Sequence, residues 1–454
     1  MSPRTHPSSV RRRRLTAALP IALVTAIAVT GTATGVAPAP GSEPEERPRL
    51  VGSAVLDEIP LGEFSNALLP GSVSDDRGVR LGVGSDLHPA GREGEFWTVT
   101  DRGPNGQIRV DGTKRRTFPV PEFDPALVKI RVSGERVRVL KAIPLTTSSG
   151  APVTGLPNQA SRDEAPYTYD ARTPLPYNPS GLDTEGMVRA PDGSFWLADE
   201  YGPSLVHVSP RGRVLARYVP EGLKLEGAGY PVVEALPAIL LQRKLNRGFE
   251  GLAVLPGGDL VAAVQSPLSV PDVAAGEASR NVRLVRFSPA EGAVTAEYAY
   301  RFDPVNVVDP GESDTSELKI SSLVALDRRT LLVQERTDKS SRLHRVTLPR
   351  GAGILGSRWD DPATSPSYEQ TGDPSAAGVP VLKKSLVVDF GTVPGVPGKI
   401  EGIALAGERT LALVNDNDFG MTDGPGAFGP DGRLIDSGVD THVVQVRLPR
   451  SLTD

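Results

Sequence analysis

The chain of 454 residues contains no cysteine. Disulfide bonds, thiolate metal sites, a cysteine nucleophile and a lipoprotein anchor are therefore excluded. The chain also lacks a Gly-x-Ser-x-Gly nucleophile elbow, a P-loop and a dinucleotide-binding fingerprint. The formal net charge of −5 gives no electrostatic basis for binding nucleic acid or an anionic membrane surface.

Long apolar runs are confined to the N-terminus, where residues 15–29 follow four arginines at 11–14. Small residues and an acidic, proline-rich stretch come next, an order typical of a secretory signal peptide. We predict a signal peptide at residues 1–39, a spacer at 40–49, and a secreted protein exported by the Sec or twin-arginine route. A membrane anchor is the alternative, although the run is short and contains Pro20. After cleavage, no stable membrane insertion is expected.

An internal repeat organises the rest of the chain. A Glu-Gly-apolar triplet occurs at residues 185–187, 250–252 and 401–403, and residues 321–323 and 86–88 occupy the same place in two diverged units. Fifteen residues after the start of each triplet comes a second, mostly polar marker: Asp101, Glu200, Gln265, Arg336 and Asp416. Self-similarity of this kind indicates a repeat architecture.

Each unit contains about four alternating, strand-like segments separated by turns rich in Gly, Asp and Pro. Four-stranded units repeated radially form a β-propeller. We therefore predict an all-β protein, a β-propeller of five or six four-stranded blades over residues 50–448, with a tail at 449–454. The last unit lacks a fourth strand, which residues 49–62 resemble. Pairing of this N-terminal strand with the C-terminal blade would close the ring and remove free edges.

Two segments depart from the strand pattern. Residues 144–178 have frequent Pro, Gly, Ser and Asp and no alternation, which predicts a long irregular insertion over one face. Residues 236–246 have the one persuasive helical pattern, with Pro237 where a first helical turn tolerates it.

The first strand of every propeller blade lines the central channel. Glu185, Glu250 and Glu401 are therefore expected to converge on the axis, with the second markers close by. Carboxylates gathered in this way repel, so they need a cation, a bound ligand or wide solvation. In the structural alternative, the glycines allow close packing of strands and the glutamates bond the backbone of a neighbouring blade.

Two short stretches, residues 199–202 and 415–420, are dense in side-chain oxygen atoms. Such oxygens suit a hard cation, and we predict a divalent cation, calcium, as cofactor. Turns with Asx hydrogen bonds are the alternative. The predicted metal ligands are Glu185, Asp199, Glu200, Glu401, Asp416 and Asp418.

Six stretches together resemble the secreted bacterial phytase-like family labelled "esterase-like activity of phytase": DRGPNG, NPSGLDTEGMV, WLADEYGPSLVHVSPRGRVLARYVP, NRGFEGLAV, KIEGIAL and LVNDNDFG. The resemblance covers roughly residues 52–448. It implies hydrolysis of phosphoesters or esters, with the repeated carboxylates as active groups. The catalytic residues that we predict on this basis are Glu185, Glu250, Glu401, Asp101 and Glu200. Ser321 and Ser322 replace the Glu-Gly pair in the fourth unit, so the ring of glutamates is incomplete.

Carboxylates alone would repel a phosphorylated substrate, so basic residues or metal ions must intervene. The predicted substrate-binding residues are Arg102, Arg247, Arg336 and Lys399, which could instead be salt-bridge partners. A Ser-His-Asp esterase is disfavoured because His88 is the only histidine near a marker.

The predicted function is that of a secreted, monomeric, phytase-like hydrolase of phosphoesters, metal-assisted at the channel mouth and acting on a small phosphorylated molecule. One alternative is a non-enzymatic propeller that binds a ligand or partner and carries a structural cation. The other is a gluconolactonase-like hydrolase of lactones. Fold alone does not decide among these functions.

Overall fold

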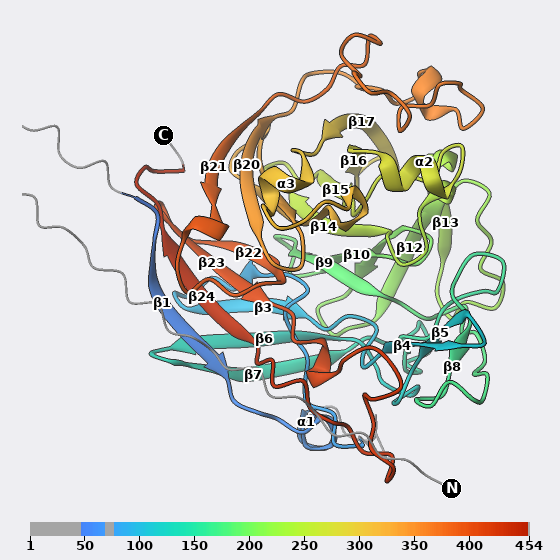
Figure 1. Cartoon of the computed structure of the whole chain (residues 1–454), viewed down its shortest axis with the longest axis vertical. Coiled ribbons are helices and arrows are strands. Elements are labelled where there is room, and N and C mark those ends of the chain that lie inside the picture. Colours follow the sequence, from blue (N-terminus) through green and yellow to red (C-terminus); the bar gives the residue numbers. More distant parts are fainter. Residues whose placement is uncertain (1–46, 69–76, 453–454) are drawn as a thin grey trace, which may run out of the picture. The chain divides into compact units, whose positions relative to one another are not determined.

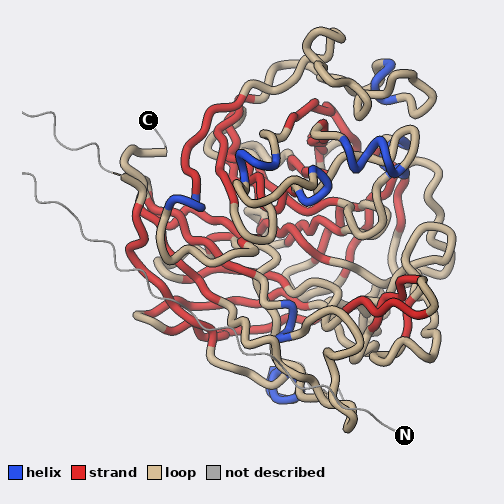
Figure 2. The backbone as a smooth tube through the Cα atoms, in the orientation of Figure 1, coloured by secondary structure: helices blue, strands red, loops and turns tan. Residues whose placement is uncertain are grey.

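The structure, a computed structural model, describes residues 47–68 and 77–452. The predicted signal peptide and most of the spacer lie outside the described residues. Strands and turns dominate, and the helices are short (Figure 2). Across the described ranges, no helix is long and apolar enough to cross a membrane.

The described residues form five four-stranded blades around one axis, which confirms the predicted β-propeller (Figure 1). From the inner to the outer strand, the first blade contains β2 (His88–Pro89), β3 (Glu95–Val99), β6 (Ala126–Ser133) and β7 (Arg136–Pro144). The second contains β9 (Thr184–Arg189), β10 (Phe195–Asp199), β11 (Ser204–Val208) and β12 (Val214–Pro220), with β13 (Val232–Leu236) added outside. The third contains β14 (Phe249–Val254), β15 (Leu260–Val264), β16 (Asn281–Ser288) and β17 (Ala293–Arg301).

The last two blades complete the ring. The fourth contains β18 (Lys319–Ala325), β19 (Thr330–Arg336), β20 (Ser341–Thr347) and β21 (Lys384–Asp389). The fifth contains β22 (Ile400–Gly407), β23 (Thr410–Asn415), β24 (His442–Arg447) and the N-terminal β1 (Arg49–Leu56).

The ring closes through β1, as the sequence predicts. β1 pairs antiparallel with β24 from Arg49 opposite Arg447 to Val55 opposite His442. It also pairs in parallel with β7 over two residues, so the first and fifth blades share one eight-stranded sheet. The N-terminal strand thus completes the last blade and links it to the first.

Inner strands lie unusually close to one another. β14 packs against β9 and β18, β18 against β22, and β2 against β22 and β9. A Cβ atom at Gly186 would stand 2.3 Å from the backbone oxygen of Glu250 in the next blade. The glycine of the repeated triplet is thus required by close approach of backbones, as the structural alternative proposes.

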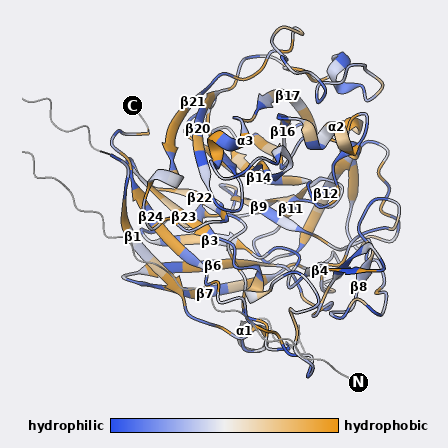
Figure 3. Cartoon of the chain, in the orientation of Figure 1, coloured by the Kyte–Doolittle hydropathy of each residue, from blue (hydrophilic) through white to orange (hydrophobic). Residues whose placement is uncertain are grey.

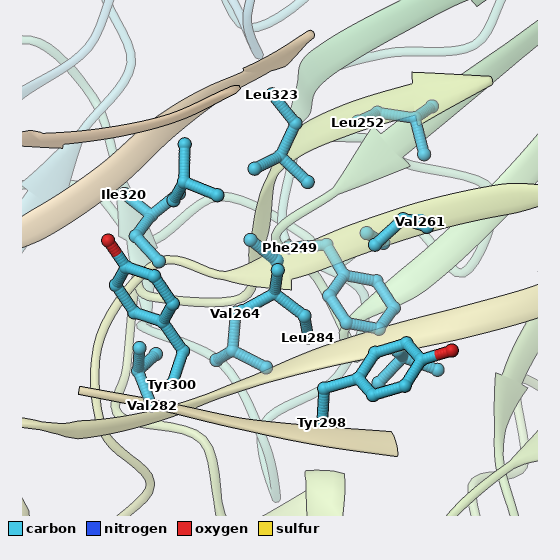
Figure 4. Packing of buried hydrophobic residues seen from close by; sticks show 14 of the residues in the cluster. Phe249, Leu252, Val261, Val264, Val282, Leu284, Tyr298, Tyr300, Ile320 and Leu323 are labelled. Atoms are coloured by element: carbon cyan, nitrogen blue, oxygen red, sulfur yellow. The ribbon is translucent and has the colours of Figure 1, made fainter. Parts of the chain in front are cut away.

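The hydrophobic core lies between the blades. Apolar residues concentrate on the strands (Figure 3). Phe249 and Leu252 of β14, for example, pack in one cluster with Ile320 and Leu323 of β18 (Figure 4). This packing holds the inner strands at fixed positions around the axis.

The helices are peripheral connections between strands. They are α1 (Leu61–Leu68), α2 (Val273–Ala278), α3 (Val305–Val308), η1 (Ala238–Gln242), η2 (Thr315–Glu317), η3 (Arg358–Asp360), η4 (Phe390–Thr392) and η5 (Asp418–Gly420), where η marks a 3₁₀ turn. The helix predicted at residues 236–246 is wrong: only η1 forms there, because Leu236 ends β13 and its carbonyl accepts a hydrogen bond from Glu221.

The predicted insertion at residues 144–178 is irregular apart from β8 (Pro166–Tyr167). β8 pairs in parallel with β5 (Thr113–Thr117), which forms a hairpin with β4 (Gly106–Val110). This small sheet and the insertion lie beside the second blade (Figure 1).

Substituting Gly186→Ala tests the packing of the inner strands. The added methyl would overlap the backbone of Glu250, so we expect the free energy of unfolding to fall by about 2 kcal/mol or more. Gly372→Ala is the matched control, since nothing lies within 4 Å of a Cβ there. Urea denaturation of both variants measures the difference, and equal midpoints would contradict the close approach.

Candidate functional site

A polar cavity of about 500 Å³ opens where the inner strands begin. Eleven of the twelve predicted site residues line it: Asp101, Arg102, Glu185, Glu200, Arg247, Glu250, Arg336, Lys399, Glu401, Asp416 and Asp418. Residues from all five blades therefore meet in one place. The cavity contains nine carboxylates and six basic side chains.

The strand register brings these side chains together. Each inner strand begins beside the end of the second strand of its own blade, as Lys319 opposite Arg336 and Ile400 opposite Asn415 show. The fifteen-residue offset therefore spans one hairpin and returns to the same end of the sheet. All five second markers line the cavity for this reason.

One wall of the cavity, formed by the first two blades, is acidic. Oxygen atoms of Asp101, Asp183 and Glu185 all lie within 4.8 Å of one another. Glu200 follows β10 on the same wall, is 2% exposed, and has an Oε1 atom with no hydrogen-bond partner among the described residues. We call Asp101, Asp183, Glu185 and Glu200 the acidic cluster.

Burial and mutual repulsion govern the protonation of the acidic cluster. Burial, followed by the charges of Glu250 and Asp183, raises the pKa of Glu185 well above its usual value. Burial raises the pKa of Glu200 in the same way, with Asp183 adding to the effect. The pKa of Asp101 is raised by burial and then by Asp416. Each carboxylate is thus costly to ionise without a neighbouring cation.

The opposite wall, formed by blades three to five, is basic. Arg336 at the end of β19 pairs with Glu250 at 3.4 Å and with Asp338 at 3.0 Å, and it also pairs with Glu401. Lys319 pairs with Asp338 at 2.7 Å. Most carboxylates on this wall therefore already have an internal cation.

Lys399 neutralises the stretch that sequence predicts as a metal loop. Its Nζ atom lies 2.7 Å from Asp416 and also contacts Asp418. The charge of Lys399 and its hydrogen bond outweigh burial and lower the pKa of Asp416. Burial and the charge of Asp416 raise the pKa of Asp418 to about 6. Lys399 thus already supplies a positive charge to both carboxylates.

Arg247 differs from its neighbours on the basic wall. Its guanidinium donates a hydrogen bond to Ser266 at 3.4 Å and forms no salt bridge with any other residue that the structure describes. It therefore has capacity left for a bound anion.

Arg102 lies on the acidic side, where it stabilises the surrounding loops. Its guanidinium is 3.0 Å from Asp183 and donates a hydrogen bond to Asn246. Glu164 of the insertion lies 4.0 Å from Arg102 and 2.9 Å from Arg116. The insertion therefore supports the rim of the cavity.

Asp199 is the one predicted site residue that does not face the cavity. Its carboxylate is fully buried, 2.6 Å from Arg217, and accepts hydrogen bonds from Ser204 and from the backbone of Asp183. Burial raises its pKa to about 6, against the opposing charge of Arg217. Alternation along β10 explains the difference, because Asp199 and Glu200 point to opposite sides.

Lys319 and Asp338 line the cavity but are not predicted from the sequence, and neither is Asp183, which belongs to the acidic cluster without lining the cavity. Asp183, Lys319 and Lys399 each lie two positions before the first marker of a blade, and only Lys399 was singled out. Period-two alternation places these residues on the same side as the marker, so this spacing is the signal that could have identified them. Asp338, two positions after Arg336, is a further example.

The acidic cluster fits a divalent cation. Its donors are carboxylate oxygens, the ligands that hard cations prefer, and one of them is buried without a partner. Oxygens up to 4.8 Å apart match ligands on opposite sides of an ion held at about 2.4 Å. A cation there would also relieve the repulsion among the carboxylates.

Fold and cavity together define a β-propeller with a charged site at one end of its axis. Residues 79–419 match the family model "Phytase-like: Esterase-like activity of phytase", and the chain belongs to this family. Membership of this family supports a hydrolase-like protein that acts on a small molecule.

A curated relative, an "uncharacterized secreted protein" of Arthroderma benhamiae, is 25% identical over 261 residues. The match covers 51% of this chain, which in turn spans about half (51%) of the relative's length.

Similar solved structures have low identities. A luciferin-regenerating enzyme is 11% identical, with 83% of this chain and 94% of that chain covered and a TM-score of 0.34. A gluconolactonase of Xanthomonas campestris is 11% identical, with coverages of 81% and 98% and a TM-score of 0.27. An aldose sugar dehydrogenase of Streptomyces coelicolor is 13% identical, with coverages of 81% and 84% and a TM-score of 0.31. We draw no inference about activity from similarities this low.

Substituting Asp199→Asn separates structural from functional carboxylates. Loss of the buried charge leaves Arg217 without its partner, so we expect the free energy of unfolding to fall by about 3 kcal/mol. The response of the melting temperature to calcium should not change. Asp57→Asn, which removes an exposed pair with Arg136, is the control and should leave the unfolding midpoint unchanged. A calcium response lost in the Asp199 variant alone would contradict this separation.

The raised pKa values predict a pH-dependent stability. In chelator, the folded protein keeps protons on the acidic cluster and on Glu401, whose pKa burial raises to about 8. The unfolded chain releases them above about pH 4, so stability should fall as the pH rises from about 5 to about 8.

Calcium should counter this loss by replacing the protons, with about 2.7 kcal/mol of stabilisation at a hundredfold excess over Kd. Thermal melts at about pH 5 and about pH 8, with calcium and with chelator, measure both effects. A calcium shift that is no larger at the higher pH would contradict the linkage.

Proposed function

We propose that this protein is a metal-assisted hydrolase of phosphoesters. The observation that carries the proposal is the division of one cavity into an acidic wall with unpaired carboxylates and a basic wall with an unpaired arginine. A phosphorylated substrate needs both, because phosphate binds cations while a metal ion needs carboxylates.

The acidic cluster would hold the cation. Glu185 makes no hydrogen bond or salt bridge to any described residue, and Glu200 has a free buried oxygen, so both can turn to a metal ion without breaking existing contacts. We favour calcium because three carboxylates converge within 4.8 Å, with Glu200 on the same wall, whereas magnesium usually keeps several waters and one or two carboxylates. A bound divalent ion supplies charge stabilisation at the phosphoryl oxygens and lowers the pKa of water.

The basic wall would bind the phosphoryl group. Arg247 is free to donate two hydrogen bonds to phosphate oxygens. Lys319, Arg336 and Lys399 add positive charge, and their carboxylate partners hold them in place. Glu250 has this positioning role, since it accepts hydrogen bonds from Gln265, Ser321 and Arg336.

Glu401 is suited to proton transfer. Its pKa of about 8, raised by burial against the charges of Arg336 and Lys399, lies close to the working range of a general acid. In the proposed reaction it donates a proton to the leaving-group oxygen.

The alternatives explain fewer of these features. A lactone is uncharged and gives no role to four basic side chains on one wall. A structural cation in a non-enzymatic propeller would explain the acidic cluster but not a glutamate near neutral pKa beside it. We further propose that the protein is secreted after cleavage of a signal peptide at residues 1–39, and that it acts as a monomer.

The activity itself is tested with the mature protein on phosphomonoesters, phosphodiesters, carboxyl esters and lactones, with calcium and with chelator. We expect calcium-dependent turnover of phosphoesters.

Glu401→Gln should lower kcat about 100-fold, most strongly for poor leaving groups, because the proton donor is lost. Glu200→Gln should weaken calcium activation at least about tenfold. Glu291→Gln, in an exposed turn outside the cavity, is the control. Turnover of lactones alone, or of no substrate, would overturn the proposal.

A further inference from the structure

A second hollow, of about 300 Å³, lies beside the central cavity. Its walls come from the insertion and from three loops, which join β10 to β11, β12 to β13, and β13 to β14. Apolar side chains are prominent among its lining residues: Ala160, Leu223, Leu241 and Leu245. Leu245 is 58% exposed, which makes it one of the most exposed large hydrophobic residues of the described chain.

The hollow and the central cavity share a rim. Leu245 lines the hollow, and the next two residues, Asn246 and Arg247, line the cavity. Glu200 lines the cavity, while Gly202 lines the hollow. Gly248 packs directly on Glu200, where a Cβ atom would stand 2.2 Å from the Glu200 carbonyl oxygen. The two loops that separate the spaces are thus in contact with each other.

Charged groups in the hollow are largely satisfied by one another. Arg243 and Asp163 form a salt bridge of 2.6 Å, with side chains 5% and 3% exposed. The other carboxylate oxygen of Asp163 accepts the backbone N–H groups of Asn158 and Gln159. This pair is therefore neutralised within the hollow. Arg162, which also lines the hollow, is exposed and donates a hydrogen bond to the backbone oxygen of Leu241 at 3.4 Å, so the leucine and alanine side chains supply the apolar contact surface.

We propose that this hollow binds the organic group of the ester whose phosphoryl group lies on the basic wall of the central cavity. The inference rests on the proposed function and narrows it to phosphate esters of apolar alcohols. A volume of about 300 Å³ is at the small end of ligand sites, enough for an aromatic ring or a short alkyl chain.

The position of Leu245 supports this assignment. It immediately precedes the residues that face the phosphoryl group, so one loop contacts both parts of the same substrate. Substrate discrimination by an apolar contact of this size is worth about 10-fold to 200-fold.

Binding of two non-hydrolysable phosphonates tests the inference directly. In calcium, phenylphosphonate should bind the mature protein at least about tenfold more tightly than methylphosphonate, as measured by titration calorimetry. Leu245→Asn should abolish most of this preference and leave the affinity for methylphosphonate unchanged. Leu386→Asn, at an exposed leucine on the outer strand β21, is the matched control and should keep the preference. Turnover of phenyl phosphate and glycerol phosphate by the same proteins should show the same pattern in KM.

Each outcome distinguishes the two proposals. Equal affinity for the two phosphonates, or a preference that Leu245→Asn leaves intact, overturns the apolar subsite while phosphoester turnover can still stand. A clear preference without turnover of any ester supports the subsite and overturns the hydrolase. Failure to bind either phosphonate overturns both.

Discussion

Repulsion among carboxylates around one axis is the constraint on which this structure depends. The inner strands must lie close together to close a ring of five blades, and they carry acidic residues into the same confined space. Three blades balance that charge with Arg336, Lys319 and Lys399. The first two blades balance it only in part, through the pair of Arg102 with Asp183, and the excess negative charge there sets the chemistry of the site.

Equivalent positions in the repeat have thus acquired opposite charges. The residue two places before the first marker is Asp183 in the second blade but Lys319 and Lys399 in the fourth and fifth. The geometry is shared by all blades, whereas the side chains differ from one blade to the next. A symmetric scaffold therefore provides an asymmetric cavity, with a place for a cation facing a place for an anion.

Features that depend on local periodicity could be predicted from the sequence. The fifteen-residue offset and the missing last strand led to the propeller, its closure and most of the cavity residues. Asp199 was assigned to the site because neighbours in sequence were treated as neighbours in space, although alternation in β10 separates it from Glu200. The hollow beside Leu245 was not predictable, because residues 160–163 and 241–245 meet only through the packing of long irregular loops. The helix expected at residues 236–246 is reduced to the 3₁₀ turn η1, because the strand β13 ends at Leu236 and tertiary pairing there outweighs local propensity.

The pairing of β1 with β24 has a consequence for how the domain assembles. β1 is synthesised before every other strand of the propeller, yet its antiparallel partner comes last. Until that partner is available, β1 exposes unpaired backbone groups and the ring has two open ends, so the entropy of closing almost the whole domain into a loop is overcome only in the final step. We therefore expect that no blade is held firmly until all five are in place and β1 has paired with β24.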